Sequence, residues 1–192
     1  FIEEEFDVPV VSQAGPEDYV RGTGGRPFDY DLFIKQPAIF ESDFRKFTRV
    51  TDILVTGHFW APGSPAFFTR EEMKDPGFRI SVIADISCDI NGPVPSTIRT
   101  TTIDDPFYGF DPFDGREVTP FSSRDGITVM AIDNLPGELP RDASEAFGKQ
   151  LIESALPVLL TGEKSEMIKA ATITINGELT SAFSYLDSYL KQ

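Results

Sequence analysis

The stretch Asp52-Ile-Leu-Val-Thr-Gly-His58 decides the fold. Its aliphatic and β-branched residues run without polar alternation up to Gly57, which is typical of a strand buried on both faces. A second run of this kind, Ile80–Ile86, follows a short predicted helix that opens with a capping box of Thr69 and Glu72. Strand, helix and strand within about 35 residues predict a crossover connection, which makes the two strands parallel. The sequence therefore predicts an α/β fold.

The two predicted strands end in residues that can face a ligand. Gly57-His58 follows the first strand, and Asp85-Ile-Ser-Cys ends the second. Because the carboxyl ends of parallel strands meet at one edge, and ligands of open α/β sheets bind at that edge, we expect these residues to form the site.

The remaining elements follow from hydrophobic periodicity and from turn residues. We expect a helix over 37–49 with Phe40, Phe44 and Phe47 on one face. A proline- and glycine-rich loop over 91–126 carries at most a short strand at 98–103. Further predictions are a strand at 127–132, a long helix over 141–160 bent by Pro157, a helix at 165–171, an Asn176-Gly177 turn and a final helix at 180–190.

Composition excludes several classes of protein. The chain has 192 residues, of which 40% are hydrophobic, so it is long enough and apolar enough to form a packed core. Its formal net charge of -14 repels nucleic acids and anionic membranes. It contains no apolar run of the roughly 18 residues that a membrane helix needs. We therefore expect no nucleic-acid partner and no membrane association.

Cysteine usage and the first residues bear on the origin of the chain. A single Cys88 cannot close an internal disulfide, so the cytoplasm is the default localisation. With one histidine and no CxxC or HxxxH, we expect no zinc or imidazole-rich metal site, and an all-carboxylate Mg or Ca site, the open alternative, has no EF-hand spacing to support it. The chain begins at Phe1, and no export signal is visible. We interpret it as a piece of a longer polypeptide.

Two motifs suggest sites that their surroundings argue against. Gly22-Thr-Gly-Gly25 resembles part of a phosphate loop, but Arg26-Pro27 follows in place of a third glycine and a helix, so we interpret it as a flexible loop. The Asp-Pro units of 102–112 suggest an acidic metal cluster, yet such units make turns and caps, which is our interpretation here.

Several blocks of sequence together resemble a known family. They are Asp52–Trp60, Phe68–Arg70, Ile83–Asp89, Thr101–Phe107 and Ile132–Pro136 with Leu139-Pro140, Ala143, Glu145 and Phe147. In order and spacing they resemble the lysine-ketoglutarate reductase and saccharopine dehydrogenase group of the alanine dehydrogenase and pyridine nucleotide transhydrogenase superfamily. The resemblance extends from about Tyr30 to the C-terminus.

The resemblance implies an enzyme with a Rossmann domain inserted into a split catalytic domain. Residues 1–89 are expected to be the C-terminal half of the NAD(P)-binding Rossmann-like domain, a doubly wound parallel sheet. Residues 90–192 are expected to be the returning segment of the catalytic domain. The missing N-terminal half of the same polypeptide would hold the glycine-rich loop and the Lys and His that transfer protons in the family.

Asp85 and Asp89 are the candidate acidic residues of the site. A carboxylate at a strand end can orient a nicotinamide ribose or pair with a catalytic Lys. The alternative for Asp89 is that it begins a turn into Asn91-Gly92 and only bonds backbone. From the resemblance, the Asp85-Ile86-Ser87 segment is expected to line the cofactor, with Asp85 catalytic and Asp89 binding.

Gly57, His58, Ile86 and Ser87 complete the expected cofactor-binding set. His58 occupies a position where the family usually has Cys or a small residue, so it is expected either to contact cofactor or substrate, or to pack within the loop. Trp60 is either an aromatic wall of the cleft or a core residue. Cys88 has no histidine beside it in the sequence, so we expect no activated thiolate.

The resulting functional expectation is a fragment of an NAD- or NADP-dependent oxidoreductase acting on the CH–NH group of an amino acid or a saccharopine-type secondary amine. Its partners would be a small-molecule amino-acid substrate, the missing half of the polypeptide and other copies in a homo-oligomer. An alanine dehydrogenase-like enzyme and a non-catalytic α/β ligand-binding module are the alternatives. Alone, this chain is expected to be inactive.

Overall fold

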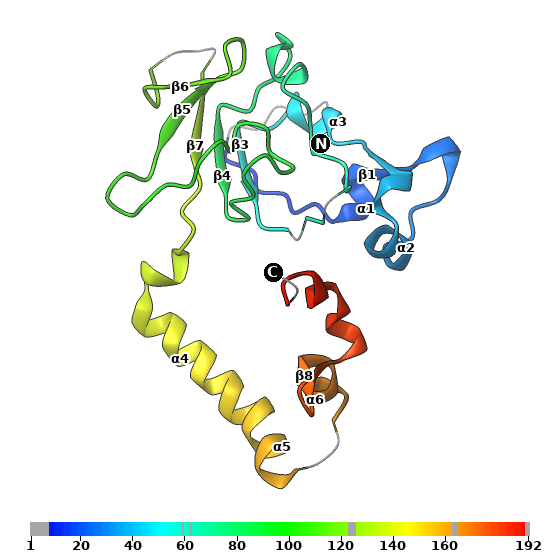
Figure 1. Ribbon diagram of the computed structural model, residues 1–192. Coiled ribbons are helices and arrows are strands. Elements are labelled where there is room, and N and C mark those ends of the chain that lie inside the picture. The colour runs from blue at the N-terminus through cyan, green and yellow to red at the C-terminus, as the bar shows by residue number, and fades with distance from the viewer. Residues whose placement is uncertain (1–7, 59, 62, 123–125, 163–164, 191–192) are drawn as a thin grey trace. The chain divides into compact units, whose positions relative to one another are not determined.

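A computed structural model describes residues 8–58, 60–61, 63–122, 126–162 and 165–190. The chain divides into two compact units, Phe1–Leu135 and Pro136–Gln192 (Figure 1). Each unit is described below by itself.

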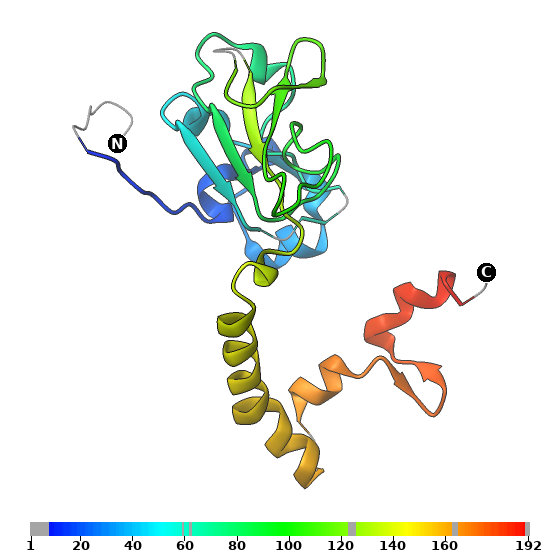
Figure 2. The same ribbon diagram turned by 90° about the vertical axis from the view of Figure 1, so that its left-hand side faces the viewer.

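The first unit is built on a five-stranded sheet with the order β3-β4-β7-β5-β6 (Figures 1 and 2). The strands are β3 (Ile53–Thr56), β4 (Val82–Asp85), β5 (Tyr108–Asp111), β6 (Arg116–Val118) and β7 (Ile127–Met130). β3, β4 and β7 are parallel, and β5 and β6 are added antiparallel. The prediction of an α/β fold with parallel β3 and β4 is confirmed.

The connection between β3 and β4 contains less helix than its sequence predicts. Only a single 3-10 turn forms, η3 (Glu72–Lys74). The capping box that opens it is present, because Thr69 N donates to Glu72 Oε2 (2.7 Å) and Glu72 N donates to Thr69 Oγ1 (3.2 Å). Asp75 and Pro76 then end the turn before it can lengthen into a helix.

β3 is not buried on both faces, so that prediction is wrong. Ile53 and Val55 are 64% and 62% exposed, and among the described residues no strand pairs with the outer edge of β3. β7, which lies inside the sheet, is buried at Ile127, Thr128 and Val129. An apolar run therefore predicted the strand correctly but not how the strand is covered.

The core of the first unit lies on one face of the sheet and is largely aromatic. Phe44 packs against Phe67 and Phe68 with ring centroids 4.8 and 6.0 Å apart, and Ile83 of β4 has no exposed surface. The segments carrying α1 (Pro16–Tyr19), α2 (Tyr30–Lys35) and α3 (Arg45–Thr48) lie to the right of β3 and β4 in Figure 1.

The helix predicted over 37–49 does not form as one element. The segment contains the turn η2 (Pro37–Ile39), the strand β2 (Phe40–Ser42) and α3. β2 pairs antiparallel with β1 (Val20–Gly22), so tertiary pairing overrides the helical spacing of the phenylalanines. The glycine motif that follows β1 forms the 3-10 turn η1 (Thr23–Gly25), with Gly24 and Gly25 in the left-handed region.

The long loop region ends inside the first unit. The strand expected at 98–103 is reduced to one parallel bridge between Thr101 and Ile132. Because β7 pairs with β4, the sheet continues well beyond residue 89. The compact units divide after Leu135, so residues on both sides of the boundary expected between 89 and 90 share one sheet, and the assignment of residues 1–89 and 90–192 to two domains stays a prediction.

The second unit follows the turn η4 (Leu135–Gly137) and is mostly helical. Its elements are α4 (Pro140–Gln150), a π-helical turn η5 (Leu151–Ala155), α5 (Leu156–Thr161), α6 (Glu166–Ala171), β8 (Thr174–Ile175), β9 (Glu178–Leu179) and the 3-10 helix η6 (Ser181–Ser188). The irregular turn η5 precedes Pro157, which has no N–H for a helical bond. The predicted Asn176-Gly177 turn is present between β8 and β9.

Burial differs sharply between the two units. In the part of the second unit that the structure describes, no residue is buried, and Phe147, Ile152 and Leu160 are 68%, 63% and 84% exposed. These apolar side chains are therefore exposed to solvent in the described part of this unit. Across the described ranges, no helix has the length and apolar character needed to cross a membrane.

Candidate functional site

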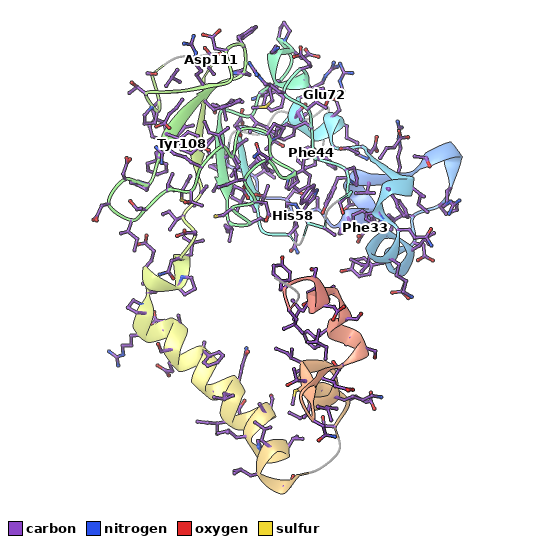
Figure 3. The ribbon with its side chains drawn as sticks, viewed as in Figure 1. Phe33, Phe44, His58, Glu72, Tyr108 and Asp111 are labelled. Carbon is purple, nitrogen blue, oxygen red and sulfur yellow. The ribbon has the colours of Figure 1, made fainter. Side chains whose placement is uncertain are left out.

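The carboxyl ends of β3 and β4 meet at one edge of the sheet. Thr56 and Asp85 are register partners, and Ile86 N donates to Thr56 O (2.8 Å). His58 follows β3 and Ser87 follows β4, and their side chains are in contact (Figure 3 labels His58). The structure thus brings together the residues that the sequence placed at this edge.

Asp85 is a fully buried carboxylate that accepts hydrogen bonds at both of its oxygens. Oδ1 accepts hydrogen bonds from Thr56 Oγ1 (2.7 Å), Ser87 N (3.1 Å) and Cys88 N (3.2 Å). Oδ2 accepts from Thr97 Oγ1 (2.6 Å), and the residue has 0% exposure. Asp85 therefore holds the residues of the edge in place from a buried position. Its catalytic role stays a prediction.

The turn after β4 depends on this carboxylate. Cys88 has a φ of 54°, a left-handed conformation that is unfavourable for a side chain with a Cβ. The amides of Ser87 and Cys88 each donate a hydrogen bond to Asp85 Oδ1, and these two bonds stabilise the turn in this conformation. Burial, followed by the charges of Asp85, Asp133 and Asp89, raises the pKa of the Cys88 thiol. The thiol is thus protonated at neutral pH and unsuited to nucleophilic attack.

Ser87 in turn fixes His58. Its Oγ donates to His58 O (3.0 Å), accepts from His58 N (3.1 Å) and lies 3.3 Å from His58 Nδ1. The imidazole also packs on Phe67, with ring centroids 4.5 Å apart. Burial lowers the pKa of His58, although Asp85 and Asp89 act in the opposite direction. His58 is therefore a neutral imidazole at pH 7.

One atom of this cluster is unsatisfied. His58 Nε2 is buried and has no hydrogen-bond partner among the residues that the structure describes. Buried polar atoms are rarely left unpaired, so each instance calls for an explanation. The imidazole is thus held by its backbone, its Nδ1 side and its ring face, while its far nitrogen makes no polar contact.

Gly57 directly follows β3, and Asp89 lies in the turn that follows β4. A Cβ added to Gly57 would meet no atom within 4 Å, so space is open beside this residue. Asp89 begins a tight turn in which Gly92 N donates to Asp89 O (2.9 Å) and Asn91 has a φ of 58°. The interpretation of Asp89 as a turn residue is confirmed, and its contact with a cofactor stays a prediction.

Ile86 lies between Asp85 and Ser87 in the sequence, and Trp60 follows His58 by two residues. Ile86 is 46% exposed, consistent with a surface residue of the edge. Trp60 is half-buried, and its Nε1 donates to Ser64 O (3.2 Å). The indole therefore bonds within its own loop, and both the cleft-wall and the core interpretations of Trp60 stay predictions.

Three residues that sequence reasoning missed belong to the cluster. Thr56 and Thr97 supply the hydroxyls that satisfy Asp85, and Phe67 supports the ring of His58. Thr56 ends a strand, a position that could have suggested it. Thr97 lies in a loop without periodicity, so no sequence signal pointed to it.

The acidic loop 102–112 has a structural role in the described residues. Asp111 Oδ1 accepts from Phe113 N (2.8 Å) and caps the turn between β5 and β6. Asp105 lies 3.9 Å from Arg99, which also pairs with Glu117 (2.8 Å). Within the described part of the chain, no cluster of three or more His, Cys, Asp or Glu is placed to hold a metal ion.

Comparison with known protein families shows a match over most of the chain. The family described as "Alanine dehydrogenase/PNT, C-terminal domain" matches residues 33–182. The match covers the whole five-stranded sheet and most of the second unit.

Individual relatives are longer than this chain. Alpha-aminoadipic semialdehyde synthase of Arabidopsis thaliana is 30% identical over 168 residues, covering 84% of this chain and 16% of that protein. The mitochondrial protein of that name from Mus musculus is 28% identical, covering 87% and 21%. Saccharopine dehydrogenase [NAD(+), L-lysine-forming] of Emericella nidulans is 35% identical over 116 residues, covering 59% and 29%.

The chain therefore spans less than a third of the length of each of these relatives. Two features support one assignment: the family match over most of the chain and the mixed α/β sheet with its parallel β3, β4 and β7. This chain belongs to the alanine dehydrogenase/PNT C-terminal domain family of dehydrogenases, and its sheet has the Rossmann-like α/β fold.

Proposed function

We propose that this chain is part of an NAD(P)-dependent oxidoreductase that acts on the CH–NH group of a saccharopine-type secondary amine. The observation that carries the proposal is the cluster at the carboxyl edge of β3 and β4, where ligands of α/β sheets bind. Relatives named saccharopine dehydrogenase and alpha-aminoadipic semialdehyde synthase support this substrate class.

The residues of the edge fit the nicotinamide part of a dinucleotide. The open space beside Gly57 admits a flat ring close to the backbone. NAD or NADP is therefore the proposed cofactor, with Gly57, His58, Ile86, Ser87 and Asp89 as the residues near it.

Bound there, the cofactor would accept a hydride from the carbon that carries the amine nitrogen. This chain's contribution is orientation. Gly57 leaves room for close approach, and Ser87 and His58 present polar atoms in fixed positions. Asp85 holds Ser87 by accepting a hydrogen bond from its amide, and Ser87 in turn holds the backbone of His58, so the backbone of the edge is fixed before a ligand binds.

Proton transfer and pyrophosphate binding are assigned to another part of the parent polypeptide. We propose that a preceding half of the same polypeptide pairs with the free edge of β3 and covers Ile53 and Val55. The backbone groups of these two residues point away from β4, because Asp52 O and Thr56 O accept bonds from that side. Association between copies is a second way of covering the same surface.

Two alternatives remain under this proposal. An alanine dehydrogenase-like enzyme would use the same edge with a smaller amino acid as substrate, and the family description is compatible with it. A non-catalytic ligand-binding module would keep the fold without the chemistry. Assay of the complete parent polypeptide with saccharopine and with alanine, each with NAD and NADP, separates all three.

Binding to this chain can be tested directly. Titration of the labelled 192-residue chain with NADH, followed by amide NMR signals, should shift the signals of Gly57, Ser87 and Asp89 with an affinity in the millimolar range. The weak affinity is expected because no glycine-rich pyrophosphate loop is in the sequence. Shifts confined to other regions would refute the assignment of the edge.

A further inference from the structure

The Ser87 hydroxyl determines which nitrogen of His58 carries the proton. This hydroxyl has one hydrogen, and its shorter acceptor contact is the carbonyl of His58 (3.0 Å), against 3.3 Å to Nδ1. With that hydrogen used, the side of Oγ facing Nδ1 is a lone pair. Two lone pairs facing each other repel, so Nδ1 must carry the hydrogen and donate it to Oγ.

The opposite tautomer is less favourable for a second reason. It would place an N–H at Nε2, which is buried and unpartnered. Orphaned buried N–H groups are rarer than under-satisfied acceptors. Both arguments leave Nε2 as an acceptor whose lone pair meets no donor among the described residues.

The geometry points to a specific ligand contact: we propose that Asp85 and Ser87 act as positioning residues that hold His58 in its Nδ1–H form, so that Nε2 accepts a hydrogen bond from an amide or hydroxyl donor of a nicotinamide nucleotide. Asp85 acts through the amides of Ser87 and Cys88, and Ser87 acts on the imidazole itself. This inference rests on the proposed function but names an atom and a tautomer that the proposed function does not require.

Because Nε2 is covered in the free chain, binding must be accompanied by a local rearrangement around His58. Trp60 lies two residues away and is the only tryptophan of the sequence. Its fluorescence therefore reports that rearrangement without interference from other indoles.

The chain suits a spectroscopic test because it contains a single histidine. A long-range proton–nitrogen NMR spectrum of the imidazole gives the tautomer without assignment. We expect Nδ1 to be the protonated nitrogen at pH 7.5, where the imidazole is neutral. The Ser87→Ala variant should lose this preference, while Ser87→Thr, which keeps the hydroxyl, and Ser144→Ala, an exposed serine of α4, should not. An Nε2–H form in the unsubstituted chain would overturn the proposal.

The ligand contact is tested with nicotinamide mononucleotide as the probe. Binding should shift the Nε2 resonance toward that of a hydrogen-bonded acceptor and change Trp60 fluorescence. The Ser87→Ala variant should weaken the affinity about fivefold, the value of one neutral hydrogen bond. Asp85→Asn, if it folds, should shift the tautomer in the direction of Ser87→Ala.

The outcomes separate the two proposals. If the amides of Gly57 and Ser87 respond to the nucleotide but Nε2 does not, the contact with His58 is refuted and the cofactor edge stands. If no signal of the chain responds at millimolar nucleotide, both the contact and the proposed cofactor edge are contradicted. The tautomer measurement is independent of either result.

Discussion

Thr97 Oγ1 donates a 2.6 Å hydrogen bond to Asp85 Oδ2 from a loop twelve residues further along the chain. Both residues are inaccessible to solvent, with 1% and 0% exposure. The bond joins the end of β4 to the loop that follows the Asp89–Gly92 turn. Because the donors that Asp85 accepts from are hydroxyls and amides, the network makes the edge rigid and also makes it sensitive to the loss of any one donor.

The first prediction concerns this network. Thr97→Val should lower the free energy of unfolding by about 1.5–3 kcal/mol, because it removes a hydrogen bond to a buried charged group. Urea denaturation of the chain measures the change, and Thr119→Val, at an exposed threonine, is the matched control. A loss no larger than that of the control would show that Oδ2 finds another donor, and the network would then be less specific than described.

Removal of Asp85 itself should have a larger effect. Asp85→Ala leaves four donors without an acceptor, so we expect a loss of about 2–4 kcal/mol in the free energy of unfolding. Asp89→Ala should cost much less, since the turn it begins is closed by its backbone carbonyl. Equal losses for the two variants would contradict the assignment of Asp85 as the anchor.

On the exposed face of β3, a substitution should leave the free energy of unfolding almost unchanged. Val55→Lys should change the free energy of unfolding by less than about 0.5 kcal/mol, because Val55 is 62% exposed, whereas Ile83→Ala should cost about 2–5 kcal/mol. The same Val55→Lys change should reduce binding of a hydrophobic dye and reduce self-association in sedimentation experiments. A large loss of stability would show that Val55 is covered in solution.

The second unit should be the less stable part of the chain. In the described residues it buries no side chain, so amides of α4 should exchange with solvent faster than those of β4 and β7. Hydrogen exchange followed by NMR gives each rate. Equal protection of α4 and β4 would mean that residues 136–190 acquire a partner surface in solution.

The single histidine produces a pH dependence of stability. Burial lowers the pKa of His58 below its usual value of 6.5, so the unfolded chain binds the proton more readily than the folded chain. The contribution of His58 to the free energy of unfolding is therefore fully present above about pH 6.5, and it is lost as the pH falls from there through the pKa of the folded chain. Urea titrations at several pH values should show this slope in the unsubstituted chain and not in His58→Gln. A slope of the same size in both would assign it to carboxylates.

The parts of the fold set by local pattern were predictable. The strands at 53–56 and 82–85, their parallel pairing and the capping box of Thr69 and Glu72 all follow from short stretches of sequence. Their shared carboxyl edge, with His58 and Ser87 upon it, follows from topology alone.

The features set by long-range packing were not predictable. Phe40, Phe44 and Phe47 have helical spacing, but the pairing of β2 with β1 breaks the segment. The exposure of Ile53 depends on what lies beside β3, which a single apolar run does not encode. Thr97 reaches Asp85 only because the 91–97 loop folds back, and no periodicity marks that path.

The most direct test of the central claim is saturation-transfer NMR from the 192-residue chain to NAD, because it reports which part of the cofactor contacts the protein. The account predicts the strongest transfer to the protons of the nicotinamide ring and its ribose, since this chain supplies the edge of β3 and β4. It also predicts that Ser87→Ala weakens the transfer. Strongest transfer to the adenine protons, unchanged in Ser87→Ala, would contradict it.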